Sequence, residues 1–350
     1  MNKYEEMIPY LLHWYRFHAR VLPWREDPSA YHVWVSEIML QQTRVEAVRS
    51  YYHRFLSELP DIAALAACPE DRLLKLWEGL GYYSRVRNMK RCAQVVCEEY
   101  DGRLPEEAAL LRKLPGIGSY TAGAIASIAF RKPEPAVDGN FLRVLSRITG
   151  SREDISDATV KRRMEDELRA VMPGEESGAL NQAIMDLGAM ICIPNGAPHC
   201  EECPLVHMCE AFREGLTGEI PKKAAKKARR IEERTVLIVR SGDRILLRKR
   251  PEKGLLAGLW EYPNEDGTLH ATEAKELLIR LIPGICIEGT RKLKAAKHIF
   301  THIEWHMTAY EISVKENPEL TLPAGYHFAG SVERAEGYSL PSAYDKWKLS

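Results

Sequence analysis

The segment Leu114-Pro115-Gly116-Ile117-Gly118-Ser119-Tyr120-Thr121 separates two stretches whose apolar residues recur at helical spacing. Pro115 is expected to end the first helix, and the two glycines to allow a tight turn with positive φ. Amides at the start of the next helix would then face outward and bind an anion. No strand precedes the segment and Thr121 stands where a third glycine would be needed, which excludes a dinucleotide fingerprint. We predict a helix–hairpin–helix over about residues 110–130 that holds a DNA phosphate through Gly116 and Gly118.

Two regimes of hydrophobic spacing follow one another along the chain. Residues 1–216 carry helical patterns such as Val45, Val48, Tyr52 and Phe55. From residue 234 the pattern is that of strands, with a hairpin signal at Ser241-Gly242-Asp243 and one helix over 275–281. Residues 297–310 alternate, with Ile299, Thr301, Ile303, Trp305 and Met307 on one face. The fold class is therefore multi-domain: an all-α domain over 1–216, then an α+β domain over 234–350.

The stretch between these regimes, residues 217–233, is expected to be a linker. Six of the nine residues from Lys222 to Arg230 are basic. This run is equally compatible with a solvated tether and with a contact to a DNA backbone. The whole chain has no net charge, because residues 1–220 carry 26 basic against 32 acidic residues (−6) and residues 221–350 carry 23 against 17 (+6). Average charge thus gives no support to a nucleic-acid partner.

Length and composition exclude several classes of protein. A chain of 350 residues suggests about two domains, and 45% hydrophobic with 28% charged residues is typical of a soluble globular protein. No apolar run reaches the ~18 residues of a membrane helix. The start, with Glu5 and Glu6 before its apolar residues, is not a secretory signal. We expect a cytoplasmic monomer without a membrane partner.

Four of the eight cysteines form a cluster near the end of the helical region. The isolated Cys68, Cys92, Cys97 and Cys286 are expected to be small buried hydrophobic residues. The clustered ones follow the pattern C-x7-C-x2-C-x5-C, which predicts one metal centre with four thiolate ligands. Zinc and an iron–sulfur cluster both fit this spacing. The ligands would be Cys192, Cys200, Cys203 and Cys209.

Three further motifs complete a pattern that resembles a known superfamily. They are Trp24-Arg25 with the run from Trp34 to Thr43 (WVSEIMLQQT), the run from Gly79 to Arg85 (GLGYYSR), and the run from Val137 to Arg143 (VDGNFLR). Together with the hairpin and the cysteines, they resemble the endonuclease III superfamily of DNA glycosylases, and within it the MutY family of adenine DNA glycosylases. The resemblance covers nearly the whole chain. It implies a 4Fe–4S cluster rather than zinc, and a partner duplex with adenine opposite 8-oxoguanine or guanine.

The resemblance also implies roles for two carboxylic acids. Glu37 is the general acid/base that protonates the imidazole ring of adenine, and Asp138 stabilises the oxocarbenium-like sugar. Without the resemblance, the sequence predicts that Asp138 is a helix N-cap and that Glu37 is a solvated helix residue. The chemistry agrees with the assignment, because adenine leaves only when protonated and the sugar cation needs a carboxylate nearby. Further implied residues are Tyr120 and Asn140 in the pocket, Gln182, Arg25 and Leu40 around the flipped base, and Gln42 and Tyr82 in the duplex.

Tyr120 distinguishes two kinds of glycosylase. Superfamily members that also nick the backbone carry a Lys in this turn as a Schiff-base amine. Tyr120 in its place predicts a monofunctional enzyme that releases the base with water. Release requires the adenine to leave the stack.

The C-terminal domain resembles a Nudix fold, with residues 254–263 (GLLAGLWEYP) as its opening segment. Residues 264–282 lack the paired Glu of a pyrophosphatase box, so metal-dependent hydrolysis is not expected. In the family this domain reads 8-oxoguanine through a Phe-Ser-His motif, and the matching residues here are Phe300, Thr301 and His302. Thr301 keeps the hydroxyl but adds a methyl group and restricts χ1. The first cysteine gap is one residue longer than usual, which we expect to form a bulge near Gly196.

Three alternative functions differ from adenine excision. A DNA-scanning iron–sulfur protein would need neither Glu37 nor Asp138. A nucleotide pyrophosphohydrolase would need the missing box. A lyase for oxidised pyrimidines would need Lys at position 120 and has no use for the second domain.

Overall fold

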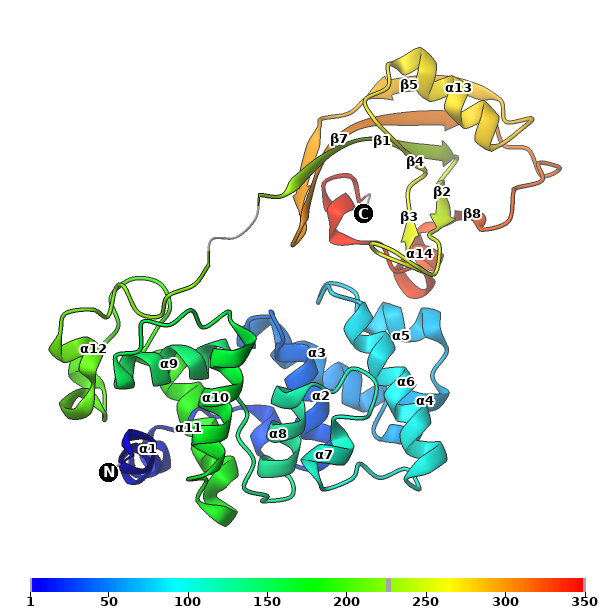
Figure 1. Ribbon diagram of the computed structural model, residues 1–350. Helices are drawn as coiled ribbons and strands as arrows, with labels where there is room; N and C mark the ends of the chain where they lie inside the picture. Colours follow the sequence, from blue (N-terminus) through cyan, green and yellow to red (C-terminus); the bar gives the residue numbers. More distant parts are fainter. Residues whose placement is uncertain (1, 225–227, 349–350) are drawn as a thin grey trace. The chain divides into compact units, whose positions relative to one another are not determined.

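The computed structural model describes residues 2–224 and 228–348. The chain divides into two compact units, Met1–Cys68 with Ser84–Ala225, and Pro69–Tyr83 with Lys226–Ser350. The first unit is helical and the second contains the sheet, as Figure 1 shows. The expected all-α and α+β parts are thus present. The segment Pro69–Tyr83, which the sequence placed in the helical domain, groups with the second unit instead.

Several helices of the first unit begin at a residue whose side chain caps the helix. Asn2, Asp61, Asp138 and Asp157 accept backbone N–H bonds at helix starts. The second helix is capped by Ser29, whose side chain accepts the backbone N–H of His32. The helices are α1 Lys3–His18, α2 Ala30–Leu40, α3 Val45–Glu58, α4 Ile62–Ala67, α6 Ser84–Glu99, α7 Ala108–Leu111, α8 Ser119–Ile128, α9 Gly139–Thr149, α10 Ala158–Arg169, α11 Ser177–Met190 and α12 Glu210–Arg213.

Helix α11 is central to this unit, because it packs against α1, α8 and α9. Leu180, Ile184 and Leu187 recur at helical spacing along it and are fully buried. Helix α8 packs closely against the chain before α9, since a Cβ at Gly123 would lie 2.1 Å from the Pro135 carbonyl oxygen. These close contacts place the starts of α8 and α9 and the side of α11 around one cavity.

The predicted helix–hairpin–helix is present as α7, a turn and α8. Gly116 has a φ of +77°, and a Cβ there would lie 2.6 Å from Cβ of Asn88. Both facts require glycine. The prediction of a positive φ at Gly118 is wrong, because its φ is −87°. A Cβ there would also meet nothing within 4 Å. Gly118 instead begins α8 as its N-cap residue.

The second unit is a mixed sheet with helices. Its elements are α5 Glu70–Leu76, β1 Arg230–Ser241, β2 Arg244–Lys249, β3 Trp260–Glu261, β4 Asn264–Asp266, α13 Ala271–Leu281, β5 Ile287–Lys292, β6 Ala296–Ile299, β7 Ile303–Val314, β8 Tyr326–Ala329 and α14 Ser331–Gly337. The strand order is β3-β2-β1-β7-β5, with β4 on β1, β6 on β7 and β8 on β2. Among the strand pairs of the described residues, β1–β7 alone is parallel.

Both faces of this sheet are covered. Along β1, Leu237 and Val239 face the cluster that contains α13, while Val236 and Ile238 face a second cluster. That second cluster contains Leu340, Ala343, Tyr344 and Trp347, so the segment 340–347, which carries no motif, contributes to the core. Figure 1 shows α13 lying over the sheet.

Three expectations about local structure are corrected. Residues 297–310 are not one strand, because β6 and β7 form an antiparallel hairpin with Phe300–His302 at its turn. The linker is shorter than 217–233: Ile220 is buried in the first unit and β1 begins at Arg230. Part of its basic run, residues 226–227, lies outside the described residues. Cys68 and Cys92 are buried as expected, but Cys97 and Cys286 are exposed.

None of the helices in the described part of the chain combines the length and the apolar character of a membrane span.

Candidate active site

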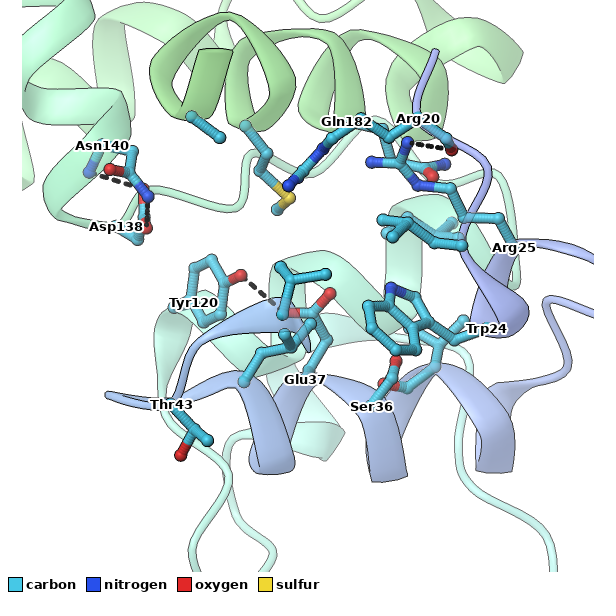
Figure 2. Close-up of a pocket in the computed structure, with 17 residues that line it drawn as sticks. Arg20, Trp24, Arg25, Ser36, Glu37, Thr43, Tyr120, Asp138, Asn140 and Gln182 are labelled. Atoms are coloured by element: carbon cyan, nitrogen blue, oxygen red, sulfur yellow. Dashed lines mark hydrogen bonds between the residues drawn. The ribbon is translucent and has the colours of Figure 1, made fainter. Parts of the chain in front are cut away.

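A cavity of about 190 Å³ lies between α2, α8, α11 and the start of α9. Figure 2 shows Asp138 and Asn140 toward one end of it, Gln182 and the two arginines toward the other, and Glu37 with Tyr120 on the α2 side. Most of the implied pocket residues are therefore brought together. The cavity is lined by Arg20, Leu22, Trp24, Arg25, Val33, Ser36, Glu37, Leu40, Thr43, Val45, Tyr120, Ile128, Asp138, Asn140, Gln182, Met185 and Ala189.

Glu37 is the buried acid of this cavity, with 5% of its surface exposed. Burial raises the pKa of its carboxyl group to about 7, partly opposed by the hydrogen bond from Tyr120. The Tyr120 hydroxyl donates to Oε2 of Glu37 over 2.5 Å. The same burial, with the nearby Glu37 and Asp138, raises the pKa of Tyr120 well above its ordinary value. Glu37 is therefore able to carry a proton near neutral pH.

Asp138 occupies a different environment. Its Oδ1 accepts the backbone N–H groups of Asn140 and Phe141, both at 2.9 Å, and its Oδ2 accepts Nδ2 of Asn140 at 2.9 Å. Burial raises the pKa of the Asp138 carboxyl, and these donors act against that rise. Three N–H donors favour a carboxylate more than the single hydroxyl on Glu37 does. The N-cap role and the site role of Asp138 thus coexist.

Asn140 is itself held in place from the far side. Its Oδ1 accepts Nη2 of Arg143 at 3.0 Å, and the same guanidinium donates to the carbonyl oxygens of Gly188 and Cys192. The orientation of the Asn140 amide is therefore fixed, with its nitrogen on Asp138.

A buried ion-pair cluster that the sequence did not reveal lines the other end. Arg25 donates through Nη1 and Nη2 to the two oxygens of Asp186, at 2.8 and 2.9 Å. Arg20 Nε adds a 2.6 Å bond to the same carboxylate, whose side chain is fully buried. Asp186 follows Gln182 by four residues, so the helical spacing of α11 was the available signal. Arg25, expected to line the base pocket, is thus anchored by a residue that was missed.

Leu40, implied to lie around the flipped base, and the two residues implied to enter the duplex have distinct settings. Leu40 lines the cavity. Gln42 and Tyr82 are exposed and lie outside it, and both have positive φ, 59° and 47°. Only five non-glycine residues of the described chain share that conformation, which is costly for L-residues and is often found at functional sites. The structure places Gly116 and Gly118 in the hairpin, away from the cavity lining.

The motif of the second unit lies at the β6–β7 turn. The Phe300 ring packs edge-on against Trp305, with ring centroids 4.8 Å apart, while Thr301 and His302 are exposed. Thr301 Oγ1 and the hydroxyl of Tyr82, both in this unit, are 3.1 Å apart. The turn thus exposes two polar side chains, Thr301 and His302, next to the packed rings of Phe300 and Trp305.

The four clustered cysteines line one small cavity with Ile191, Val206 and Phe212. Arg147 donates from Nη1 to Sγ of Cys192 at 3.3 Å. Across the described residues, no three His, Cys, Asp or Glu side chains converge as a single metal ion requires. The longer first gap is a loop closed by the 3.0 Å bond from His199 N to Ile191 O, with Gly196 at a φ of +80°.

Fold and cavity together define a helix–hairpin–helix DNA glycosylase of base excision repair. Residues 35–170 match the family model described as "HhH-GPD superfamily base excision DNA repair protein", and residues 234–347 match the NUDIX domain model. A thermostable thymine-DNA glycosylase has a similar structure, with a TM-score of 0.56 and 27% identity over 61% of this chain and 97% of that one. An endonuclease III bound to DNA, 24% identical with a TM-score of 0.52, shares the fold over 61% of this chain and 98% of its own.

The relatives in sequence are more specific than the class. Adenine DNA glycosylase of Mus musculus is 35% identical over 90% of this chain and 72% of its own. That of Homo sapiens is 34% identical over 90% and 68%, and that of Buchnera aphidicola 33% over 85% and 84%. The chain belongs to the adenine DNA glycosylase family.

Proposed function

We propose that this protein hydrolyses the N-glycosidic bond of adenine mispaired with 8-oxoguanine or guanine in duplex DNA. The observation that carries the proposal is the pair of carboxylic acids in one cavity. Glu37 is desolvated with one hydroxyl donor, and Asp138 accepts three N–H groups. Two acids whose surroundings differ in this way divide the roles of proton donor and charge stabiliser.

Glu37 supplies the proton that makes adenine a leaving group. With a pKa of about 7, a large fraction of the group is protonated near neutrality and is still acidic enough to transfer the proton. Protonation of the imidazole ring lets the bond between the sugar and the base break with its electron pair on the base. The base then leaves neutral, and the Glu37 carboxylate can accept the proton of the attacking water.

Asp138 stabilises the sugar as positive charge develops on it. Its carboxylate is fixed by the first turn of α9 and by Asn140, so no reorganisation is needed during the reaction. The cavity end that holds Asp138 and Asn140 therefore faces the sugar, and the far end, with Arg25 and Gln182, surrounds the base.

Tyr120 supports base release without strand cleavage. A lyase step needs an amine to form a Schiff base with the sugar, and a phenol cannot. No lysine is among the residues that line the cavity in the described chain. The product we propose is an intact abasic strand.

The second unit reads the base opposite the adenine. The β6–β7 turn offers the Thr301 hydroxyl and the His302 ring at an exposed position, which suits hydrogen bonding to an 8-oxoguanine. The Tyr82 hydroxyl beside Thr301 is part of the same surface.

Cys192, Cys200, Cys203 and Cys209 would hold a 4Fe–4S cluster. When bound, the cluster would cross-link the loop over residues 192–209 and so contribute to the stability of the fold. The fit rests on four thiols around one apolar cavity, with the Arg147 guanidinium on the Cys192 sulfur to offset thiolate charge.

Single-turnover release of adenine from a duplex with adenine opposite 8-oxoguanine tests the proposal. Strand breakage is scored with and without alkali, and breakage only after alkali is expected. A duplex with adenine opposite thymine serves as the substrate control. Tight binding of the mispair without any adenine release would favour the scanning protein and contradict the proposal.

A further inference from the structure

Tyr15 on α1 contacts the base end of the cavity through Gln182. Its hydroxyl donates to Oε1 of Gln182 over 3.1 Å. The two residues are 167 positions apart in the chain, and the packing of α1 against α11 brings them together. Tyr15 does not itself line the cavity, whereas Gln182 does.

Arg25 determines the direction of this hydrogen bond. Its guanidinium carbon lies 5.6 Å from the centroid of the Tyr15 ring, and Asp186 holds it there by two bonds. A cation over a phenol ring makes the hydroxyl a better donor and a poorer acceptor. Tyr15 therefore selects the oxygen of the Gln182 amide and leaves its nitrogen on the other side.

The amide nitrogen of Gln182 is then available to a ligand. Within residues 2–224 and 228–348 it donates a hydrogen bond to no other side chain or carbonyl. Both Nη atoms of the Arg25 guanidinium are bonded to Asp186, whereas Arg20 uses only its Nε there. Gln182 is thus an uncharged side chain at this end of the cavity with two N–H donors still free.

We propose that Tyr15 is a specificity-determining residue, which fixes Gln182 so that its amide nitrogen donates to N1 of the flipped adenine. The inference rests on the proposed function and deepens it. N1 is the ring nitrogen farthest from the glycosidic bond, and Gln182 lies toward the end of the cavity away from Asp138 and Asn140. Adenine has a lone pair at N1, while guanine and hypoxanthine carry a proton there. A fixed donor therefore accepts adenine and rejects the other two.

Single-turnover release opposite 8-oxoguanine is compared for adenine and for 1-deazaadenine, in which a C–H replaces N1. On this replacement, the rate of base release by wild-type protein is expected to fall about five- to tenfold more than the rate of a Gln182→Ala variant does. This difference is the size of one net hydrogen bond. Tyr15→Phe keeps the ring beneath Arg25 but frees the amide to rotate. It is expected to show less than about half of the wild-type loss. Because each protein is compared on both bases, intrinsic differences between the bases cancel.

A second pair of substrates, adenine and hypoxanthine, tests a variant that presents acceptors in place of donors. Gln182→Glu presents only acceptors, so it is expected to lower the ratio of adenine to hypoxanthine release at least about tenfold. Tyr10→Phe, on the exposed side of the same helix, is the matched control and should keep the wild-type ratios. The melting temperature of each variant confirms that it is folded.

Two failures remain distinguishable. If wild-type protein releases no adenine, the proposed function itself fails. If it releases adenine but Tyr15→Phe retains the full 1-deazaadenine loss, or slows both bases equally, Tyr15 does not set the orientation of Gln182 and the inference is overturned.

Discussion

The hydroxyl of Tyr120 donates over 2.5 Å to the carboxylate of Glu37. Tyr120 is the second residue of α8, directly after the hairpin turn, and Glu37 lies on α2. The turn predicted to hold a DNA phosphate therefore also positions the donor to the acid that we propose protonates adenine. In the proposed function, one short segment would serve both binding of the DNA backbone and protonation of the base.

The rate of adenine release should fall as pH rises through the pKa of Glu37. The protonated group is the reactant, so single-turnover rates should be level below about pH 7 and fall about tenfold per unit above it. Glu37→Gln should lose at least ~100-fold and show no such fall. A wild-type rate that rises through neutrality would contradict the role of Glu37 as the acid.

The same group links stability to pH. Burial raises the Glu37 pKa from 4.5 to about 7, so the folded state binds more protons than the unfolded state between these values. Stability must then decrease as pH rises through that window, by about 2–3 kcal/mol between about pH 5 and pH 8. Relative to Glu37→Gln, wild-type protein should melt at a lower temperature at the higher pH. Equal melting temperatures for the two proteins at both pH values would show that burial does not raise this pKa.

Tyr120→Lys should introduce strand cleavage. The amine would lie at the cavity wall next to Asp138 and Glu37, where it can attack the sugar. Breakage without alkali, and covalent trapping on DNA by a hydride reductant, are expected. Tyr120→Phe, which removes only the hydroxyl, is the control and should give neither. Tyr120→Lys that binds DNA but cannot be trapped would argue against the position of this residue near the sugar.

Asp186→Asn should be among the most destabilising substitutions in the helical unit. It leaves two arginines beside a fully buried position without their carboxylate, at a cost of about 3–5 kcal/mol. Release of adenine should slow as well, because Arg25 loses its anchor. Glu176→Gln, which removes an exposed pair with Arg16, should cost no more than about 1 kcal/mol. Chemical denaturation of the three proteins measures the difference, and similar midpoints would refute the argument.

Cys203→Ser should abolish binding of the cluster. Wild-type protein purified without air should contain about four iron atoms and as many sulfide ions per chain. The variant should contain little of either and should melt at a lower temperature. Cys286→Ser, at an exposed position away from the cysteine cavity, is the control. One zinc per chain in the wild-type protein would instead select the other metal that the spacing allowed.

Thr301→Val should weaken discrimination for 8-oxoguanine. Valine keeps the shape of threonine and removes the hydroxyl that lies 3.1 Å from that of Tyr82. The ratio of adenine release opposite 8-oxoguanine to release opposite guanine should fall about five- to tenfold. Thr301→Ser should keep the wild-type ratio. An unchanged ratio in Thr301→Val would leave the hydroxyl without a role in reading the lesion.

The sequence was most informative where function requires local pattern. The hairpin and the four cysteines were predicted from the spacing of residues within short segments, whereas the roles of Asp138 and Glu37 were implied by the family resemblance of their motifs. The strand pattern over 297–310 was misread for a related reason. Alternation continues across a tight turn, and only the pairing of β6 with β7 shows that Phe300–His302 is a tip. Likewise, nothing local distinguishes the terminal Tyr344 and Trp347 from a loose tail, although both are buried.

By itself, the sequence determined the two-part architecture and the family, and it predicted which residues carry the chemistry. Tertiary structure alone decided what those residues experience. The pKa of Glu37 depends on its burial and on its contact with Tyr120. The position of Arg25 depends on its ion pair with Asp186, and the direction of the Gln182 amide depends on Tyr15. These effects arise between helices that are far apart in the chain, because desolvation and hydrogen-bond geometry act across packed surfaces and leave no periodic trace in the sequence.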